Sequence, residues 1–255
     1  MKKLNFIKVN PAGNITILID KLNINEEDIM TISEILMKET SLHAEQVGFI
    51  KESHLQMMGG EFCGNASRAF ASLLAFRDKN FKDQKNYSIS CSGVRETLDV
   101  DVRSESEENK FLAKIKMPKF LNMKEIKFEN ETLILVEFSG IHHFIYEGKE
   151  DKKKVIDFAR NYLEDKEYLA LGLMFFNEKK MEMLPYVYVK GFCKGVWENS
   201  CASGTTALGF YLKKYKKIEK AKIIQPNGWL EFSFDEENIY IDGPVEIVAE
   251  GKVYI

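Results

Sequence analysis

The sequence predicts an α+β protein built from two lobes. Short apolar runs with the spacing of strands alternate with helical patterns along all 255 residues, and the order of these elements repeats in outline after Pro118. Hydrophobic residues make up 45% of the chain, which is enough to fill a core in each half. Because the chain has only five prolines and no low-complexity linker, we expect tightly packed lobes with a boundary near residue 118.

The first half combines strands with two helices. Asn25 is a suitable N-cap for the first helix, and Glu26, Glu27 and Asp28 follow it in the first turn. One face of this helix carries Ile29, Ile32, Ile35 and Leu36, and the helix after Cys63 carries Ala66, Ala69, Phe70, Leu73 and Leu74 at helical spacing. The expected strands are Leu4–Val9, Ile15–Ile19, Val47–Ile50, Tyr87–Cys91 and Phe111–Met117.

The second half follows a similar order. A helix is expected over Lys153–Leu163, and a second one runs from Cys201 to about Tyr215. The expected strands are Thr132–Phe138, His143–Tyr146, Leu169–Phe175, Tyr186–Val189, Ala221–Ile224, Trp229–Phe234, Ile239–Ile241 and Val245–Val253. The two halves therefore look like duplicates.

Composition narrows the class of protein. With 36 basic and 39 acidic residues, nothing in the charge points to nucleic acid or an anionic membrane, and a small neutral or zwitterionic substrate fits better. No apolar stretch approaches the ~20 residues that span a bilayer, and we expect a cytoplasmic protein. The four cysteines show no CxxC spacing, so free thiols are expected; the four histidines show no HExxH motif, so no metal site is expected.

Two cysteines, one in each half, open runs of small residues that lead into helical patterns. The first run is Gly59-Gly60-Glu61-Phe62-Cys63-Gly64-Asn65-Ala66-Ser67-Arg68, and the second is Trp197-Glu198-Asn199-Ser200-Cys201-Ala202-Ser203-Gly204-Thr205-Thr206. At a helix N-terminus, unpaired N–H groups and the helix dipole favour a thiolate and bind an anion. One such cysteine alone would more often be a buried apolar residue, which is what we expect of Cys91 and Cys193. The duplicated context favours a pair of catalytic thiols.

With both runs in view, the chain resembles the cofactor-independent amino-acid racemases of the diaminopimelate epimerase fold. The resemblance implies two pseudo-symmetric lobes, each a curved, mainly antiparallel sheet around a central helix. The N-terminal lobe, residues 1–118, would carry Cys63, and the C-terminal lobe, residues 119–255, would carry Cys201. The strand at residues 248–255 would cross back to the first lobe, and the family commonly forms homodimers. The lobes would clamp one small pocket between the two cysteines.

The resemblance also implies a reaction and a set of substrate contacts. One cysteine as a thiolate removes the Cα proton, and the other as a thiol returns a proton to the opposite face, without cofactor or metal. Asn14 belongs to a Gly-Asn turn like that of the family, and Gln46 matches a position before a strand. The backbone at Gly64, Asn65, Ala202, Ser203 and Gly204 would grip the substrate carboxylate.

Departures from the epimerase pattern concern the distal end of the substrate. Phe192 and Cys193 replace the Glu-Arg pair that holds a second carboxylate, and Gly140-Ile141-His142-His143 replaces a Gly-Asn-Pro-His stretch. A substrate with two zwitterionic ends would lose its bidentate partner, since Arg matches a carboxylate geometrically.

Similarity is greater to the histidine racemase branch, known from the staphylopine-type metallophore pathway. The similar stretches are Asn10–Leu18, Glu45–Ile50, Gly60–Ala66, Trp197–Cys201 and Ala249–Ile255. Ala202 departs from the branch, which usually has Gly there. Glu45 would hold the imidazole N–H of histidine, although a solvated acid at a strand edge fits the same pattern.

Several assignments stay open. Glu198 is either a supporting residue beside Cys201 or a solvated loop acid, and Phe62 and Trp197 either exclude water from the site or pack between lobes. His142 and His143 fit a pocket wall or core better than a catalytic base. The alternatives for function are a diaminopimelate or lanthionine epimerase, another amino-acid racemase of this fold such as one for hydroxyproline, and a non-catalytic binding module.

Overall fold

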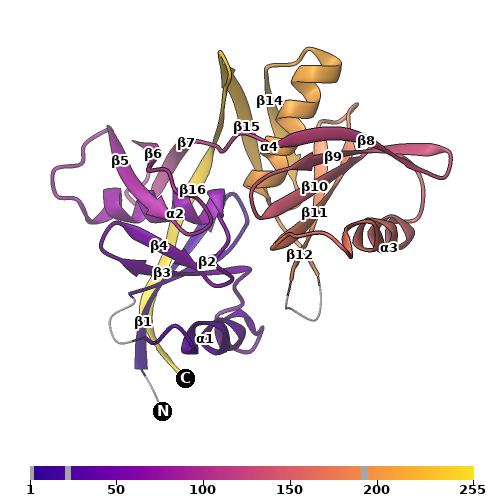
Figure 1. The fold of residues 1–255 in the computed structure, drawn as a ribbon. Helices are drawn as coiled ribbons and strands as arrows, with labels where there is room; N and C mark the ends of the chain where they lie inside the picture. The colour runs from indigo at the N-terminus through magenta and orange to yellow at the C-terminus, as the bar shows by residue number, and fades with distance from the viewer. Residues whose placement is uncertain (1–2, 21–23, 191–194) are drawn as a thin grey trace. The chain divides into compact units, whose positions relative to one another are not determined.

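The computed structural model describes residues 3–20, 24–190 and 195–255. It confirms an α+β protein with few helices and many strands (Figure 1). The chain divides into two compact units. Unit 1 comprises Met1–Lys116 with Asp242–Ile255, and unit 2 comprises Met117–Ile241. Strand β16, Asn238–Tyr254, begins in unit 2 and continues through unit 1, where the sequence had predicted two strands.

The strands of unit 1 close on themselves. They are β1 Lys3–Pro11, β2 Thr16–Asp20, β3 Gln46–Lys51, β4 His54–Met57, β5 Gln84–Cys91, β6 Leu98–Ser104 and β7 Lys110–Lys116. Each pairs with the next, and β16 pairs with both β7 and β1. The pairs β2–β3 and β4–β5 are parallel, so this sheet is mixed. A closed ring leaves no unpaired edge in this part of the chain.

Helix α2, Gly64–Arg77, is the central element of unit 1. It contacts β1, β2, β5, β6 and β7, and its residues are buried on nearly every side, which explains its weak amphipathic pattern. Small residues such as Ala66, Ala69 and Ala71 let the surrounding strands approach the helix backbone. The first helix, α1 Asp28–Met37, instead buries one face through Ile29, Ile32 and Leu36.

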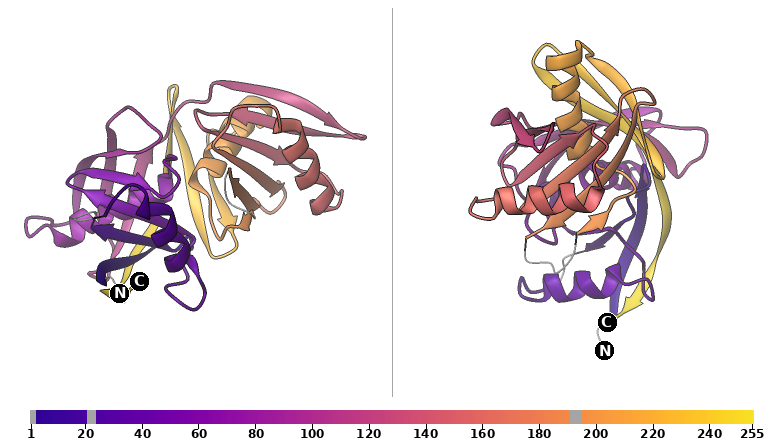
Figure 2. Two further views of the ribbon diagram at one scale, coloured as in Figure 1. Left: turned by 60° about the horizontal axis from the view of Figure 1, so that its bottom comes forward. Right: turned by 90° about the vertical axis from the view of Figure 1, so that its right-hand side faces the viewer.

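Unit 2 is a sheet with one helix on each face. Its strands run in the order β16, β15 Gly228–Asp235, β14 Lys220–Gln225, β12 Glu182–Val189, β11 Ala170–Asn177, β10 Ile141–Tyr146, β9 Glu131–Glu137 and β8 Asn122–Phe128. The short β13, Val196–Trp197, pairs with β12. Helix α3, Lys152–Leu163, lies along one face of the sheet (Figure 2). Its Val155, Ala159 and Leu163 belong to the hydrophobic cluster with the strands. Helix α4, Ala202–Tyr211, contacts β10, β11, β14 and β15.

Some predicted boundaries were wrong for identifiable reasons. Asn25 does not cap α1; a turn follows it, and Glu27 stands at the N-cap without a side-chain bond. The helix after Cys201 does run to about Tyr215 as predicted, but only its first part, α4 to Tyr211, is α-helical, and Leu212–Lys216 form a π-helical turn. Strands β4, β6 and β8 were not predicted. β4 is only four residues long and β8 is mostly polar, whereas β6 carries the alternation of a half-buried strand and its omission was an oversight.

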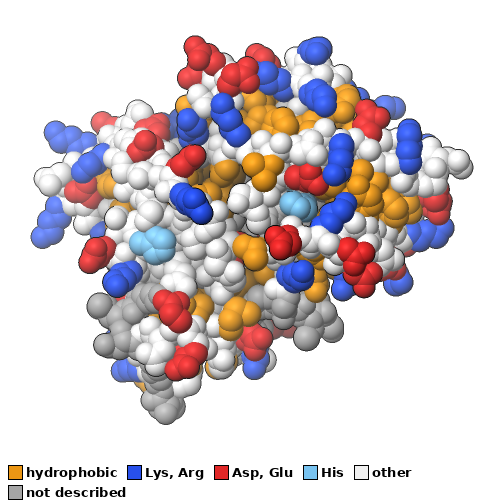
Figure 3. Space-filling view, in the orientation of Figure 1, with side chains coloured by type: hydrophobic (Ala, Val, Ile, Leu, Met, Phe, Trp, Pro, Cys, Tyr) orange, Lys and Arg blue, Asp and Glu red, His pale blue; other side chains and the backbone are white. Residues whose placement is uncertain are grey.

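Charge on the surface is mixed, as the composition suggests. Basic and acidic side chains alternate over the face drawn in Figure 3 without a large area of one sign. Within the described segments, no helix is long and apolar enough to cross a membrane.

Candidate functional site

Cys63 forms the N-cap of α2. Its backbone is extended, with φ −128° and ψ 110°, and its Sγ lies 3.4 Å from the backbone nitrogen of Ala66, which donates to it. The Ser67 hydroxyl donates to the Cys63 carbonyl oxygen at 2.9 Å and so fixes the first turn. A sulfur that accepts an N–H at a helix start is stabilised as a thiolate by that bond and by the dipole.

Cys201 repeats this geometry in unit 2. It is the N-cap of α4, with φ −137° and ψ 110°, and the backbone nitrogen of Gly204 donates to its Sγ at 3.4 Å. The Thr205 hydroxyl donates to the Cys201 carbonyl oxygen at 2.7 Å, as Ser67 does in unit 1. The Ser203 hydroxyl lies 3.5 Å from the sulfur. Both predicted thiols therefore begin helices through the same local contacts.

Gln225, at the end of β14, holds the Cys201 backbone in place. Its Oε1 accepts the Cys201 backbone N–H at 2.8 Å, and its Nε2 donates to the Thr205 hydroxyl at 3.1 Å. The Thr205 hydroxyl in turn donates to Cys201, so the three residues form a closed network with Gln225 only 4% exposed. Such a satisfied buried network fixes the position of the sulfur.

The surroundings of Cys201 favour its neutral form. Burial, the charge of Glu198 and a hydrogen bond to that carboxylate raise the pKa of the Cys201 thiol well above its ordinary value, against weaker opposing bonds from Ser203 and Gly204. Glu198 is itself 7% exposed, and its backbone nitrogen donates to the Pro185 carbonyl oxygen at 3.0 Å. The acid therefore lies inside the protein beside the sulfur, as in the first of its two predicted roles.

Arg68 is buried completely within α2, near the start of the helix. Its guanidinium donates to the Ala113 carbonyl oxygen at 2.8 Å, to Asn65 Oδ1 at 3.1 Å and to the Pro244 carbonyl oxygen at 3.1 Å. Desolvation lowers the pKa of Arg68 to about 10, while attraction to Asp242 and Cys63 raises it. The group therefore stays charged at neutral pH and orients Asn65, one of the predicted substrate contacts.

Asn14 and Glu45 form a polar pair in unit 1. A tight turn brings Asn14 inward: Ala12 and Gly13 have positive φ values of 58° and 99°, and the Asn10 side chain accepts the Gly13 N–H at 2.7 Å. Asn14 Nδ2 donates to Glu45 Oε2 at 2.9 Å. Asn14 Oδ1 is buried without a hydrogen-bond partner among the described residues. A buried acceptor of this kind suits a ligand donor.

The remaining predicted residues lie at the starts of β3, α2 and α4. Gln46 is buried at the start of β3, where its backbone nitrogen donates to the Ile15 carbonyl oxygen. Gly64 and Ala202 are buried first residues of α2 and α4. Gly204 cannot carry a side chain without movement, because an added Cβ would lie 2.1 Å from Met174 Sδ. Phe62 is half-buried, whereas Trp197 is 44% exposed and packs against Phe175 and Tyr186.

His143 is a core residue. It is fully buried on β10, next to Gly172, and burial lowers its pKa to about 3, so it is neutral at pH 7. His142 beside it is half-buried. Cys91 is buried in unit 1 beside the Cys63 backbone and Ser67, and burial raises the pKa of its thiol. Phe192 and Cys193 lie outside the described residues.

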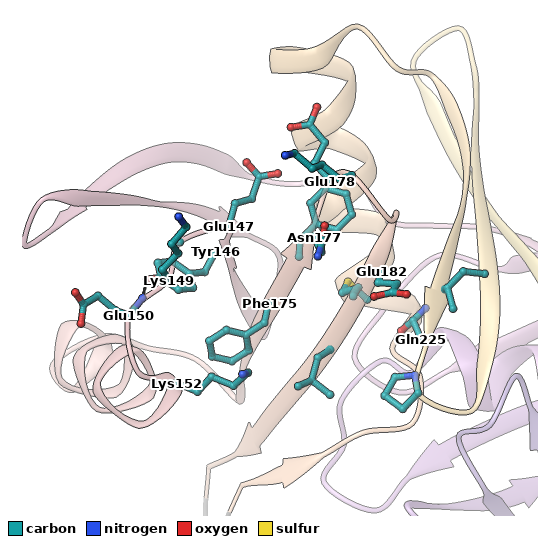
Figure 4. A pocket seen from close by; sticks show the side chains of 17 residues that line it. Tyr146, Glu147, Lys149, Glu150, Lys152, Phe175, Asn177, Glu178, Glu182 and Gln225 are labelled. Atoms are coloured by element: carbon teal, nitrogen blue, oxygen red, sulfur yellow. Dashed lines mark hydrogen bonds between the residues drawn. The ribbon is translucent and has the colours of Figure 1, made fainter.

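Unit 2 also has a groove whose lining does not include the candidate catalytic cysteines. Tyr146, Phe175 and Leu184 form its apolar lining, charged residues from Glu147 to Lys152 border it, and Gln225 reaches its edge (Figure 4). Neither Cys63 nor Cys201 lines it. Among the residues that the structure describes, no three His, Cys, Asp or Glu side chains gather as metal ligands.

Sequence reasoning missed the supporting residues. Gln225 was not visible in the sequence, because its partners Cys201 and Thr205 are 24 and 20 positions away. Thr205 lay within the second cysteine run, but its role depends on the bond from Gln225. Arg68 is the last residue of the first cysteine run, and its position five residues after Cys63 could have indicated a role in supporting that cysteine.

Comparisons of sequence show the family of this chain, and comparison with solved structures shows its fold. The model described as the histidine racemase CntK N-terminal domain matches residues 3–254. A histidine racemase from Fusobacterium nucleatum subsp. nucleatum (strain ATCC 23726) is 64% identical over 256 residues, covering 99% of this chain and 97% of the relative. A histidine racemase from Staphylococcus aureus (strain Mu50) is 26% identical, covering 99% and 98%. A predicted epimerase from Pseudomonas aeruginosa has a similar fold, with a TM-score of 0.70, 10% identity and full coverage of both chains.

Proposed function

Because the chain belongs to the histidine racemase family, we propose that it is an isomerase that interconverts L- and D-histidine, with Cys63 and Cys201 as its two bases. The observation that carries the assignment of the bases is their shared geometry. Each sulfur caps a helix and accepts a backbone N–H from the residue three positions later at 3.4 Å. Free cysteines that are only core residues have no need of this arrangement.

The chemistry follows from the groups at the two helix starts. A thiolate removes the Cα proton, the electron pair of the broken C–H bond delocalises toward the substrate carboxylate, and the other thiol donates its proton to the opposite face. No pyridoxal ring is proposed, so the protein must stabilise the enolate-like charge. Backbone N–H groups at residues 64–65 and 202–204 would supply positive potential at the carboxylate.

Unit 1 and unit 2 would act as the two lobes of the enzyme. We propose that they are the pseudo-symmetric halves implied by the family resemblance, with the lobe boundary near residue 118 and the end of β16 in the first lobe. The support is local: each unit carries one cysteine-capped helix, and a hydroxyl four residues after the cysteine bonds the cysteine carbonyl in both.

Substrate choice would depend on Asn14 and Glu45. Glu45 as a carboxylate would accept the imidazole N–H, and its bond to Asn14 Nδ2 at 2.9 Å holds it in place. The buried Asn14 Oδ1 would accept a second substrate donor, with Gln46 nearby in sequence at the start of β3. A panel of histidine, diaminopimelate, lanthionine and hydroxyproline tests this assignment, and faster turnover of diaminopimelate would overturn it.

The two-base assignment is tested by deuterium incorporation at Cα during turnover of L-histidine in D₂O. The Cys63→Ala and Cys201→Ala variants should each lose formation of deuterated D-histidine, because racemisation requires a group on both faces. Cys91→Ala removes a buried thiol that is not a helix cap, and it should retain the reaction. Deuterated D-histidine at the parental rate in either of the first two variants would refute the assignment.

Assembly and location complete the proposal. The family resemblance supports a homodimer, and the free thiols of Cys63, Cys91 and Cys201 fit the reducing conditions of a cytoplasmic enzyme. Light scattering coupled to gel filtration distinguishes a dimer, near twice the 29.4 kDa chain mass, from a monomer.

A further inference from the structure

The two cysteine sites differ in the charged residue that supports each of them. We infer that Arg68 holds Cys63 as the thiolate and that Glu198 holds Cys201 as the neutral thiol, so the resting enzyme carries its single exchangeable proton on Cys201. This inference rests on the proposed two-thiol reaction, and it assigns Arg68 and Glu198 as positioning residues rather than catalytic ones.

The two runs differ in sequence at equivalent positions. Five residues after each cysteine stand Arg68 in the first run and Thr206 in the second, and three residues before stand Gly60 and Glu198. Thr206 brings no charge; its hydroxyl donates to the Ala202 carbonyl oxygen at 2.8 Å. The helix starts are alike, but a cation supports one and an anion supports the other.

Arg68 is fixed so that its charge cannot move away from Cys63. Three hydrogen bonds, two of them to the carbonyl oxygens of Ala113 and Pro244, hold the guanidinium in the core, and no part of it is exposed. Attraction between Arg68 and the Cys63 thiolate raises the pKa of Arg68. Coupling between two charges is reciprocal, so the same free energy stabilises the thiolate.

The acidic groups near Arg68 and Cys63 balance this cation only in part. Attraction to Asp242 raises the pKa of Arg68 more than attraction to Cys63 does, but Asp242 is also paired with Arg103, whose Nη2 lies 2.5 Å from its carboxylate. Burial raises the pKa of Glu61, whose carboxylate accepts the Gly59 N–H at 2.9 Å, and so favours its neutral form. The Cys91 thiol is also kept neutral, because burial raises its pKa. Arg68 is thus a buried, fixed cation that is attracted to the first sulfur.

At Cys201 the balance is reversed. Burial is the largest cause that raises the pKa of the Cys201 thiol, and the like charge of Glu198 opposes a thiolate further, while a hydrogen bond to the Glu198 carboxylate also favours the protonated sulfur. With Cys201 5% exposed and Glu198 7% exposed, water does not screen this repulsion well. The bond from Gly204 and the Ser203 hydroxyl act in the other direction but are weaker.

The proton count of one turnover follows from this assignment. The Cys63 thiolate takes the Cα proton and becomes a thiol, while the Cys201 S–H bond breaks and its proton forms the new Cα–H bond. The enzyme is left with the proton on Cys63 and an anion on Cys201 beside Glu198. Repulsion from Glu198 then favours return of the proton to Cys201, either through solvent or by turnover of the opposite enantiomer.

The test is the pH dependence of alkylation of each cysteine in the full-length enzyme, measured with iodoacetamide and peptide mass spectrometry. The pH midpoint, rather than the rate, is compared, because burial alone slows the alkylation of Cys201. Cys63 should titrate at least one pH unit below Cys201. Equal midpoints, or a lower midpoint for Cys201, would overturn the inference.

Variants assign the difference to the two charges. Glu198→Gln keeps the size of the side chain and should lower the Cys201 midpoint without moving that of Cys63. Arg68→Met should raise the Cys63 midpoint, and Arg68→Lys should restore it in part by keeping the charge. If Arg68→Met does not fold, the parental midpoints and Glu198→Gln still decide the outcome; an unchanged Cys201 midpoint in Glu198→Gln contradicts the role of Glu198.

The outcomes also separate this inference from the proposed function. Racemisation of histidine with the reversed order of midpoints would leave the function standing and remove the proton assignment. The predicted order in an enzyme that does not racemise histidine would remove the function instead.

Discussion

Replacing Glu45 with Gln tests how the protein would recognise an imidazole. The change removes a charge but keeps an acceptor oxygen and the size of the side chain. The amide oxygen of the substituted side chain can still accept the Asn14 Nδ2–H, which now donates to Glu45 Oε2 at 2.9 Å. The fold should therefore survive, with a loss of at most about 1 kcal/mol in the free energy of unfolding, the size of one neutral hydrogen bond.

The loss on the substrate should be larger than the loss in stability. A hydrogen bond from the imidazole N–H to a carboxylate is charge-assisted, and exchanging it for a neutral amide costs about 1–3 kcal/mol. At about 1.4 kcal/mol for each factor of ten, kcat/KM for histidine should fall roughly 5- to 150-fold. The assay follows optical rotation or chiral chromatography from both enantiomers.

A second substrate provides the control. An amino acid without a ring N–H, such as norvaline, makes no such bond, so its residual turnover should be equal in the parent and in Glu45→Gln. Equal losses for histidine and norvaline would show that Glu45 supports the site generally and does not read the ring. No loss for histidine would refute the contact altogether.

Three further predictions concern the supporting structure. Gln225→Leu leaves the buried Cys201 N–H and Thr205 hydroxyl without their partner, so chemical denaturation should show a loss of about 1–3 kcal/mol, against less than about 0.5 kcal/mol for the exposed Gln84→Leu. Gly204→Ala places a Cβ 2.1 Å from Met174 Sδ and should cost about 1–3 kcal/mol, and combination with Met174→Ala should cost less than the sum of the two changes. His143 has a pKa of about 3 when folded and near 6.5 when unfolded, so the unfolded chain binds the extra proton between these values. Stability should therefore fall as the pH drops from about 6.5 toward 3, by at most about 1.4 kcal/mol per pH unit, and His143→Phe should remove this part of the slope while the exposed His43→Asn keeps it. A parallel pH dependence in His143→Phe and the parent would contradict the last of these.

Local sequence patterns were sufficient where the determining contacts are near in sequence. The cysteine caps are the clearest case: a run of small residues at each cysteine that leads into an apolar helical pattern predicts a helix start, and both helices begin there. The Asn14 turn was visible for the same reason, since its bonds run between residues 10 and 14. The α+β class followed from the alternation of periods along the chain.

Only the tertiary structure decided which distant residues support these sites. Gln225 reaches the Cys201 backbone from 24 positions away, and Arg68 bonds a carbonyl 176 positions away in β16. Closure of the unit 1 strands by β16 and the missed strands β4 and β8 likewise depend on pairing with neighbours rather than on their own apolar pattern. Burial also sets the charge of each group, which the residue type alone does not. Desolvation by the surrounding core disfavours both the protonated form of His143 and the thiolate form of Cys201.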